Sequence, residues 1–284
     1  MQRTPPWRTL GQFLLSLALL FALQAPCLAA EPLRILAGTT LVEDILMDLG
    51  GGWLTTRTLI PGSACPGHSD VKASDVTFSQ GATAVIIHDW QQDMPMIQSL
   101  LRSVPGGAGK VRVAAASGNW MLPERQIVAT SAVAKILSEL APTKASAIDA
   151  KARSRIARAK TLAAQLKERA ANIRLTGTRV ICDAMQRPLL EWLGFHVVAE
   201  YGRFEGMNPK QLAAIMTRAK VEKAVLVVDN MQSTGGSGKA LADDLGAAHV
   251  TLTNFPGVDP RAMTWEGALE WNVGQIAAAL AARK

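Results

Sequence analysis

The stretch Ala145–Asn172 holds 28 residues without a glycine or a proline, and it constrains the fold more than any other part of the chain. Its apolar side chains recur with a helical period, at Ile148, Ala152, Ile156, Ala159, Ala163, Leu166 and Ala170. A helix of this length spans about 42 Å, and nothing inside it would act as a hinge. We therefore predict one long, rigid helix that joins two lobes.

Short apolar runs alternate with helical periods on both sides of this helix, as in parallel sheets flanked by helices. The predicted strands are Leu33–Ala37, Arg57–Ile60, Ala84–Ile87, Val111–Ala114, Arg179–Cys182, Val197–Glu200, Ala224–Val228 and His249–Thr253. The predicted helices between them are Val42–Leu49, Ala73–Gln80, Met94–Val104, Gln186–Leu193, Pro209–Ala219, Ser237–Leu245 and Trp265–Ala282. We predict an α/β fold of two lobes, each with a mainly parallel sheet flanked by helices.

The N-terminus predicts export. Arg3 and Arg8 precede the apolar run Phe13–Leu23, and Ala29 and Ala30 provide small residues for cleavage. The apolar run is too short to span a bilayer of about 30 Å as a helix. We expect residues 1–30 to be a signal peptide, 31–123 an N-terminal lobe, 124–176 a helical segment with the long helix, and 177–284 a C-terminal lobe.

The three cysteines bear on the compartment and its chemistry. Cys27 raises the alternative of a lipoprotein, but Pro26 precedes it where such a signal would have a small residue. We favour a soluble periplasmic protein, from which Cys27 leaves with the signal peptide. Cys65 and Cys182 then remain in an oxidising space, where a disulfide and a metal site are both chemically open.

Charge and motifs exclude other classes of function. The formal net charge is +7, and the basic residues concentrate on the predicted long helix, where a solvated face explains them. We expect no nucleic-acid partner. The chain contains no Gly-x-Ser-x-Gly or His-Glu-x-x-His motif, and no general acid and base can be paired. We therefore expect a protein that is not an enzyme. We also expect a monomer.

The loop Pro61–Asp70 directly follows the predicted strand Arg57–Ile60. Ligands of open α/β sheets bind at the carboxyl ends of the strands. Cys65 and His68 have the Cys-x-x-His spacing, which lets a thiolate and an imidazole reach one metal ion from a single turn. The alternative is a Gly- and Pro-rich turn with incidental side chains.

Other possible donors stand at the ends of further strands: Cys182, His88, Asp229 and Asn254. Because carboxyl ends of parallel strands share one edge of a sheet, we expect these side chains to face one cleft. A disulfide between Cys65 and Cys182 across the cleft remains an alternative. His196 and His249 lie at the starts of strands, and we interpret both as structural.

The order of several short segments points to a family. These are Leu41–Ile45 before Gly50 and Gly51, Pro61-Gly62 leading to His68, Ser74-Asp75, Trp120, Pro123, Cys182–Ala184, Gly194-Phe195, Asn208-Pro209 and Asn272. Over Leu33–Leu280 the chain resembles the zinc- and manganese-binding solute receptors of bacterial ABC importers. The resemblance implies two α/β lobes joined by a long rigid helix, with the metal between the lobes.

The resemblance also implies a ligand set of three histidines, the third sometimes a glutamate, and a late acid. His68 matches the first histidine, whereas the second falls on Gly118 or Asn119, the third on Cys182 and the acid on Asn254. A changed ligand set is therefore implied, with Cys65 as an added ligand. Thiol and imidazole donors suit zinc or copper better than manganese.

We therefore predict a periplasmic binding protein that captures a transition-metal ion as its transported ligand and delivers it to the membrane permease of an ABC transporter. Zinc is the favoured ion, with copper or manganese as alternatives. One different interpretation is an exported thiol–disulfide or electron-transfer protein that uses Cys65 and Cys182. Another is a receptor of the same fold for a chelated metal or a small organic ligand, suggested by the missing family ligands and by Trp90 and Trp120 near the cleft.

Overall fold

Two parallel four-stranded sheets organise the computed structural model, which describes residues 32–233 and 236–282. The predicted signal peptide, 1–30, lies outside the described residues. The first sheet has the order β2-β1-β3-β4, with β1 (Leu33–Thr39), β2 (Leu54–Ile60), β3 (Ala84–His88) and β4 (Val111–Ala114). All its pairs are parallel, and Ile35 of β1 pairs with Ala84 of β3.

The second sheet repeats this topology as β6-β5-β7-β8. Its strands are β5 (Arg179–Asp183), β6 (His196–Tyr201), β7 (Leu226–Asn230) and β8 (Ala248–Leu252), and all its pairs are parallel. All five residues of β3 and of β7 are buried. Central strands that are buried on both faces read as continuous apolar runs, which is why the sequence pattern located them.

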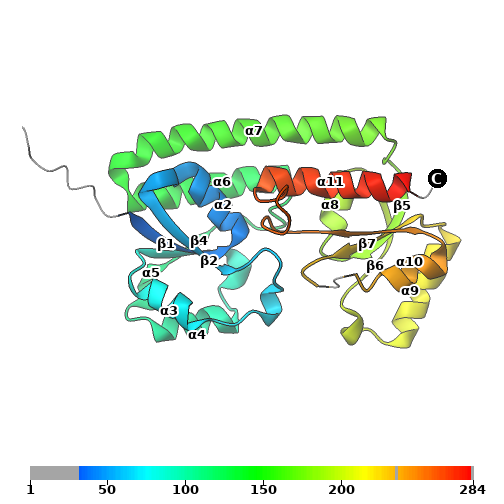
Figure 1. Cartoon of the computed structure of the whole chain (residues 1–284), viewed down its shortest axis with the longest axis horizontal. Coiled ribbons are helices and arrows are strands. Elements are labelled where there is room, and N and C mark those ends of the chain that lie inside the picture. Colours follow the sequence, from blue (N-terminus) through cyan, green and yellow to red (C-terminus); the bar gives the residue numbers. More distant parts are fainter. Residues whose placement is uncertain (1–31, 234–235, 283–284) are drawn as a thin grey trace, which may run out of the picture. The chain divides into compact units, whose positions relative to one another are not determined.

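Helices cover both sheets (Figure 1). In the first lobe these are α2 (Thr40–Gly50), α3 (Ala73–Gln80), α4 (Pro95–Ser103) and α5 (Gly107–Lys110). In the second they are α8 (Arg187–Trp192), α9 (Pro209–Val221), α10 (Lys239–Leu245) and α11 (Trp265–Ala281). Side-chain oxygens cap the N-termini of several helices. Thr39, Asn208 and Thr264 each accept a free backbone N–H group, in α2, α9 and α11 respectively. Within the described residues no helix is long and apolar enough to cross a membrane.

Two long helices connect the lobes. α6 (Pro123–Leu140) leads into α7 (Ala145–Asn172), which has the bounds predicted from the sequence. α7 packs against α6 and α2 on one side of the molecule and against α11 further along (Figure 1). The predicted α/β fold, with two mainly parallel sheets and one long linking helix, is confirmed.

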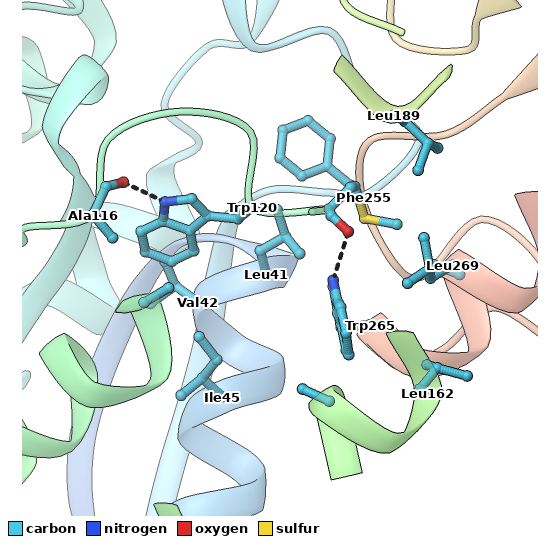
Figure 2. Packing of buried hydrophobic residues seen from close by; sticks show 14 of the residues in the cluster. Leu41, Val42, Ile45, Ala116, Trp120, Leu162, Leu189, Phe255, Trp265 and Leu269 are labelled. Carbon is cyan, nitrogen blue, oxygen red and sulfur yellow. Dashed lines mark hydrogen bonds between the residues drawn. The ribbon is translucent and has the colours of Figure 1, made fainter. Parts of the chain in front are cut away.

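Among the hydrophobic clusters of the described residues, one runs through both lobes (Figure 2). It joins Leu41 of α2 and Trp120 from the first lobe to Phe255 and Trp265 from the second. The indole nitrogen of Trp265 donates to the carbonyl of Met121, 3.3 Å away. Because interiors are close-packed, a large rotation of one lobe against the other would break this shared core.

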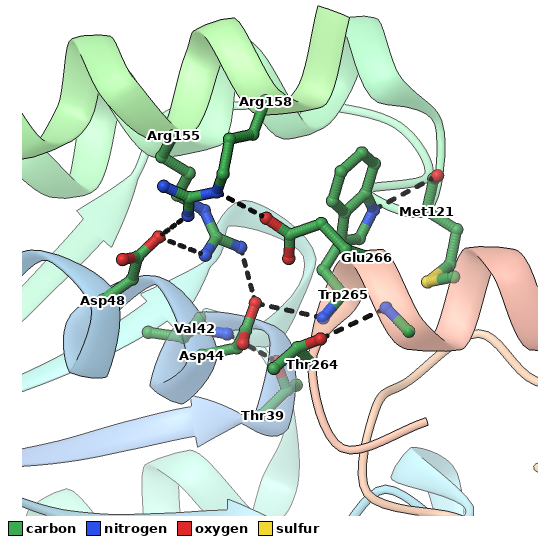
Figure 3. Close-up of polar contacts among 11 residues, drawn as sticks. Thr39, Val42, Asp44, Asp48, Met121, Arg155, Arg158, Thr264, Trp265 and Glu266 are labelled. Carbon is green, nitrogen blue, oxygen red and sulfur yellow. Dashed lines mark hydrogen bonds and ion pairs between the residues drawn. The ribbon is translucent and has the colours of Figure 1, made fainter. Parts of the chain in front are cut away.

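A buried ionic network lies beside that cluster (Figure 3). Arg155 of α7 is 2% exposed and forms ion pairs with Asp44 and, at 3.0 Å, with Asp48, both on α2. Asp44 also accepts the backbone N–H of Trp265 at 3.2 Å. The Asp44 carboxylate therefore ties α2 of the first lobe to the linking helix and to the start of α11.

Candidate functional site

A cavity of about 930 Å³ lies at the carboxyl ends of strands from both sheets. Its lining includes Leu41 just after β1, His88 at the end of β3, Asp183 at the end of β5 and Asn230 at the end of β7. These four strands are the paired central strands of their sheets, β1 with β3 and β5 with β7. Each pair is a topological switch point, where open parallel sheets bind their ligands.

The loop after β2 is shaped by its own turn hydrogen bonds. The backbone N–H of His68 donates to the carbonyl of Cys65 at 3.1 Å, and the hydroxyl of Ser69 donates to the same carbonyl at 2.8 Å. This places His68 in the short helix η2 (Pro66–His68), one turn from Cys65. Cys65 is half-buried and lines the cavity, whereas His68 is exposed beside it.

Arg203, in the loop after β6, reaches this first-lobe loop from the second lobe. Its Nη1 lies 2.9 Å from Nε2 and 3.1 Å from Nδ1 of His68, and its Nη2 donates to Sγ of Cys65. Arg203 lines the cavity. Sequence reasoning missed it, because a single arginine after a strand carries no motif.

His88 lines the cavity and is buried beside two aromatic rings. Its ring centroid lies 3.8 Å from that of Trp120 and 5.2 Å from that of Trp90. Nε2 is hydrogen-bonded to the hydroxyl of Thr39 at 2.8 Å, and Nδ1 is buried without a partner among the described residues. Burial lowers the pKa of His88 to about 3, so the ring is neutral at physiological pH.

Cys182 was expected to face the cleft, but the structure places it in the hydrophobic core. Its side chain is fully buried together with Val180 and Val228, and it does not line the cavity. Burial, followed by the neighbouring Asp183 carboxylate, raises the pKa of its thiol. Both Cys65 and Cys182 are free thiols. The strand end that reaches the cavity is Asp183, one residue further on.

Asp229 is likewise directed away from the cavity. Its carboxylate accepts hydrogen bonds from Tyr201 and His249, each at 2.8 Å, and from the backbone N–H of Gly238 at 2.9 Å. Burial alone would raise the pKa of Asp229, but the hydrogen bonds from His249 and Tyr201 outweigh it and lower the pKa. These contacts give Asp229 and His249 a place in the packing of the second lobe.

Asn254 lines the cavity within a cluster of amide side chains. Its Nδ2 donates to Oδ1 of Asn230 at 3.2 Å, and its Oδ1 accepts from Nδ2 of Asn119 at 3.1 Å. Asn119 comes from the first lobe, at one of the positions where the resemblance places the second histidine. The amide cluster therefore links the two lobes across the cavity.

The six predicted donors do not come together in one cluster. Only His68 and Cys65 lie together, joined by their backbone hydrogen bond and by the side chain of Arg203. His88, Cys182, Asp229 and Asn254 have the separate surroundings described above. Across residues 32–233 and 236–282, no group of three or more His, Cys, Asp or Glu side chains is arranged to hold a metal ion.

Comparison with known proteins gives a family match over most of the chain. Residues 35–279 match the model of the ZnuA family, described as zinc-uptake complex component A, periplasmic. No curated protein matches the chain by sequence.

Solved structures share the fold. A cadmium-bound periplasmic metal-binding protein from Candidatus Liberibacter asiaticus has a TM-score of 0.73 and 15% identity, over 87% of this chain and 99% of that chain. Its manganese-bound form gives the same values. A crystal structure of ZnuA has a TM-score of 0.73 and 18% identity, over 88% of this chain and 99% of that chain.

Proposed function

Because this chain belongs to the ZnuA family of periplasmic metal-binding components, we propose that it captures a transition-metal cargo in the cavity between its sheets and delivers it to the permease of an ABC importer. Members of the family are solute-binding proteins and not enzymes, and they are periplasmic, which agrees with both expectations from the sequence. We further propose that the protein acts as a monomer.

The observation that carries this proposal is the position of Cys65 and His68. A thiol and an imidazole stand one helical turn apart, at the edge of a cavity formed by the switch points of both sheets. Nitrogen and sulfur donors of this kind bind zinc at about 2.0–2.3 Å. This donor pair favours zinc as the metal, ahead of manganese, which prefers carboxylate and water oxygens.

The placement of Cys182 weighs against the thiol–disulfide alternative. Exchange requires an accessible thiolate, and burial keeps the Cys182 thiol protonated and enclosed in the core. Cys65 lines the cavity while Cys182 packs against Val180 and Val228, so the two thiols do not face a common space.

Metal binding by the exported chain tests the proposal. Zinc is offered both as the free ion and as a complex with nitrilotriacetate, and binding is measured by calorimetry and by elemental analysis of the gel-filtered protein. We expect one zinc per chain. We expect His68→Ala or Cys65→Ser to lower the affinity for whichever of the two zinc forms the wild type binds more tightly, by at least about tenfold. A growth experiment tests delivery to the importer. A deletion strain in zinc-depleted medium should be rescued by the wild-type gene but not by a gene that carries both His68→Ala and Cys65→Ser.

His196→Ala is the matched control. His196 is exposed and begins β6, so it lies at the opposite edge of the second sheet from the cavity. Its removal should leave zinc affinity unchanged. The proposed function would be contradicted if His68→Ala and His196→Ala lost zinc affinity equally. It would also be contradicted if the wild type bound neither free zinc nor the nitrilotriacetate complex.

A further inference from the structure

The guanidinium of Arg203 contacts Cys65 and His68, the two side chains that are best suited to hold a metal. Its contacts with Cys65 Sγ and with the ring nitrogens of His68 block the approach of an ion to these atoms. A metal that binds there must displace the guanidinium and then lies close to it. Because two cations repel each other in a half-buried cleft, the site disfavours a bare divalent ion.

The positive charge of Arg203 has no acidic partner in the described part of the chain, since none of the ion pairs there includes it. Two acids line the cavity, but each bonds elsewhere. Asp89 accepts from Ser117 and from the N–H of Trp90, and Asp183 accepts from Ser233 and from the N–H of Met185. A guanidinium released from Cys65 and His68 therefore needs an anion from the cargo, and its fork of N–H groups suits a carboxylate.

The cavity is far larger than a metal ion requires. Its volume of about 930 Å³ falls within the range of sites for small organic molecules, about 300–1,000 Å³. Two large apolar side chains of its lining are open to solvent, Trp90 at 43% and Met185 at 57% exposure. Exposed apolar side chains around a cavity favour contact with an organic ligand.

We propose that the cargo enters this cavity as an anionic metal chelate, with its metal on Cys65 and His68 and a carboxylate of the chelator on Arg203. This inference rests on the proposed function as a transition-metal receptor. It explains why fewer than three metal-binding side chains converge among the described residues, because the chelator supplies the remaining donors. It also gives Arg203 the role of a specificity-determining residue, since a carboxylate offsets the charge that would otherwise repel the metal.

Two zinc complexes of similar shape and opposite charge provide the test. Nitrilotriacetate and tris(2-aminoethyl)amine both wrap zinc from a central nitrogen and leave coordination positions open for protein donors. The first complex is an anion and the second is a cation. Calorimetry on the exported wild-type chain compares both complexes with free zinc and with nitrilotriacetate alone. We expect the anionic complex to bind at least about tenfold more tightly than either cation.

Arg203→Gln should lower the affinity for the anionic complex by about 10- to 100-fold, the effect of losing a charge-assisted hydrogen bond. Its affinity for free zinc should stay equal or rise. Arg187→Gln is the control, because Arg187 is an exposed arginine of the same lobe that pairs with Glu191 and Glu200 outside the cavity. It should bind all probes as the wild type does. Thermal unfolding verifies that both variants are folded.

The outcomes separate this inference from the function on which it rests. If free zinc or the cationic complex binds as tightly as the anion, or if Arg203→Gln weakens all three equally, the chelate proposal is wrong and the metal receptor stands. If no form of zinc binds, or if nitrilotriacetate alone binds as well as its zinc complex, both proposals are wrong.

Discussion

Replacing Arg155 by methionine should weaken the contacts between α2, α7 and α11, the helices that hold the two lobes together. Arg155 is the buried centre of the network in Figure 3, with Asp44 and Asp48 of α2 as its partners. Methionine has a similar length and keeps much of the packing of the arginine stem, but it removes the charge. Asp44, which is only 9% exposed, would then keep the N–H of Trp265 as its remaining partner among the contacts of the network.

The expected cost follows from leaving one charge buried without its counterion. Removal of one member of a buried ion pair destabilises proteins by about 3–5 kcal/mol. For a domain of this size, each kcal/mol lowers the melting temperature by about 2–4 °C. We therefore expect Arg155→Met to lower the free energy of unfolding by about 3–5 kcal/mol and the melting temperature by about 6–20 °C.

Arg153→Met is the matched comparison on the same helix. Arg153 is 68% exposed and pairs with the exposed Asp149, so its loss should cost less than about 1 kcal/mol. Urea unfolding followed by circular dichroism measures both variants. Adding Asp44→Asn to Arg155→Met should recover part of the loss, because the buried carboxylate is then neutral. Equal destabilisation by the two arginine variants would refute the reasoning.

Two further predictions concern the cavity's surroundings. A Cβ atom on Gly62 would lie 2.0 Å from the carbonyl oxygen of Pro256, so Gly62→Ala should destabilise the chain by about 1–3 kcal/mol in urea unfolding, whereas Gly52→Ala, with no atom within 4 Å, should change stability by less than about 0.5 kcal/mol. Because burial lowers the pKa of His88 from 6.5 to about 3, the unfolded chain binds its proton first, and stability should fall as the pH drops through this window, by about 2 kcal/mol between pH 7.5 and pH 5. His88→Gln should lose this part of the pH dependence, and an unchanged profile in that variant would contradict the assignment.

The fold was predictable because its signals are local. Ala145–Asn172 has a helical period and no breaker, and α7 has those bounds. Several strands of the sheets are short apolar runs between turns, such as β3, and Val111–Ala114 forms β4 as predicted. α6 received no bounds from the sequence, because 124–176 was predicted as a helical segment in which only the long helix had a clear period. Contacts between distant segments, such as those of Arg155 and Arg203, depend on pairs of residues more than 100 positions apart, and no local pattern encodes them.

The site was harder to predict because side chains alternate along a strand, so an error of one residue exchanges the two faces. The sequence ended one strand at Cys182, and the structure extends β5 to Asp183, which lines the cavity while Cys182 packs in the core. β7 repeats this offset, because Asp229 turns to Tyr201 and His249, and Asn230 reaches the cavity. In both strands the expected metal donor points away from the cavity. The next residue along the strand lines the cavity instead, and its side chain is hydrogen-bonded. This error affects the loop after β2 less, because the turn that joins Cys65 to His68 is set by local hydrogen bonds and not by strand register.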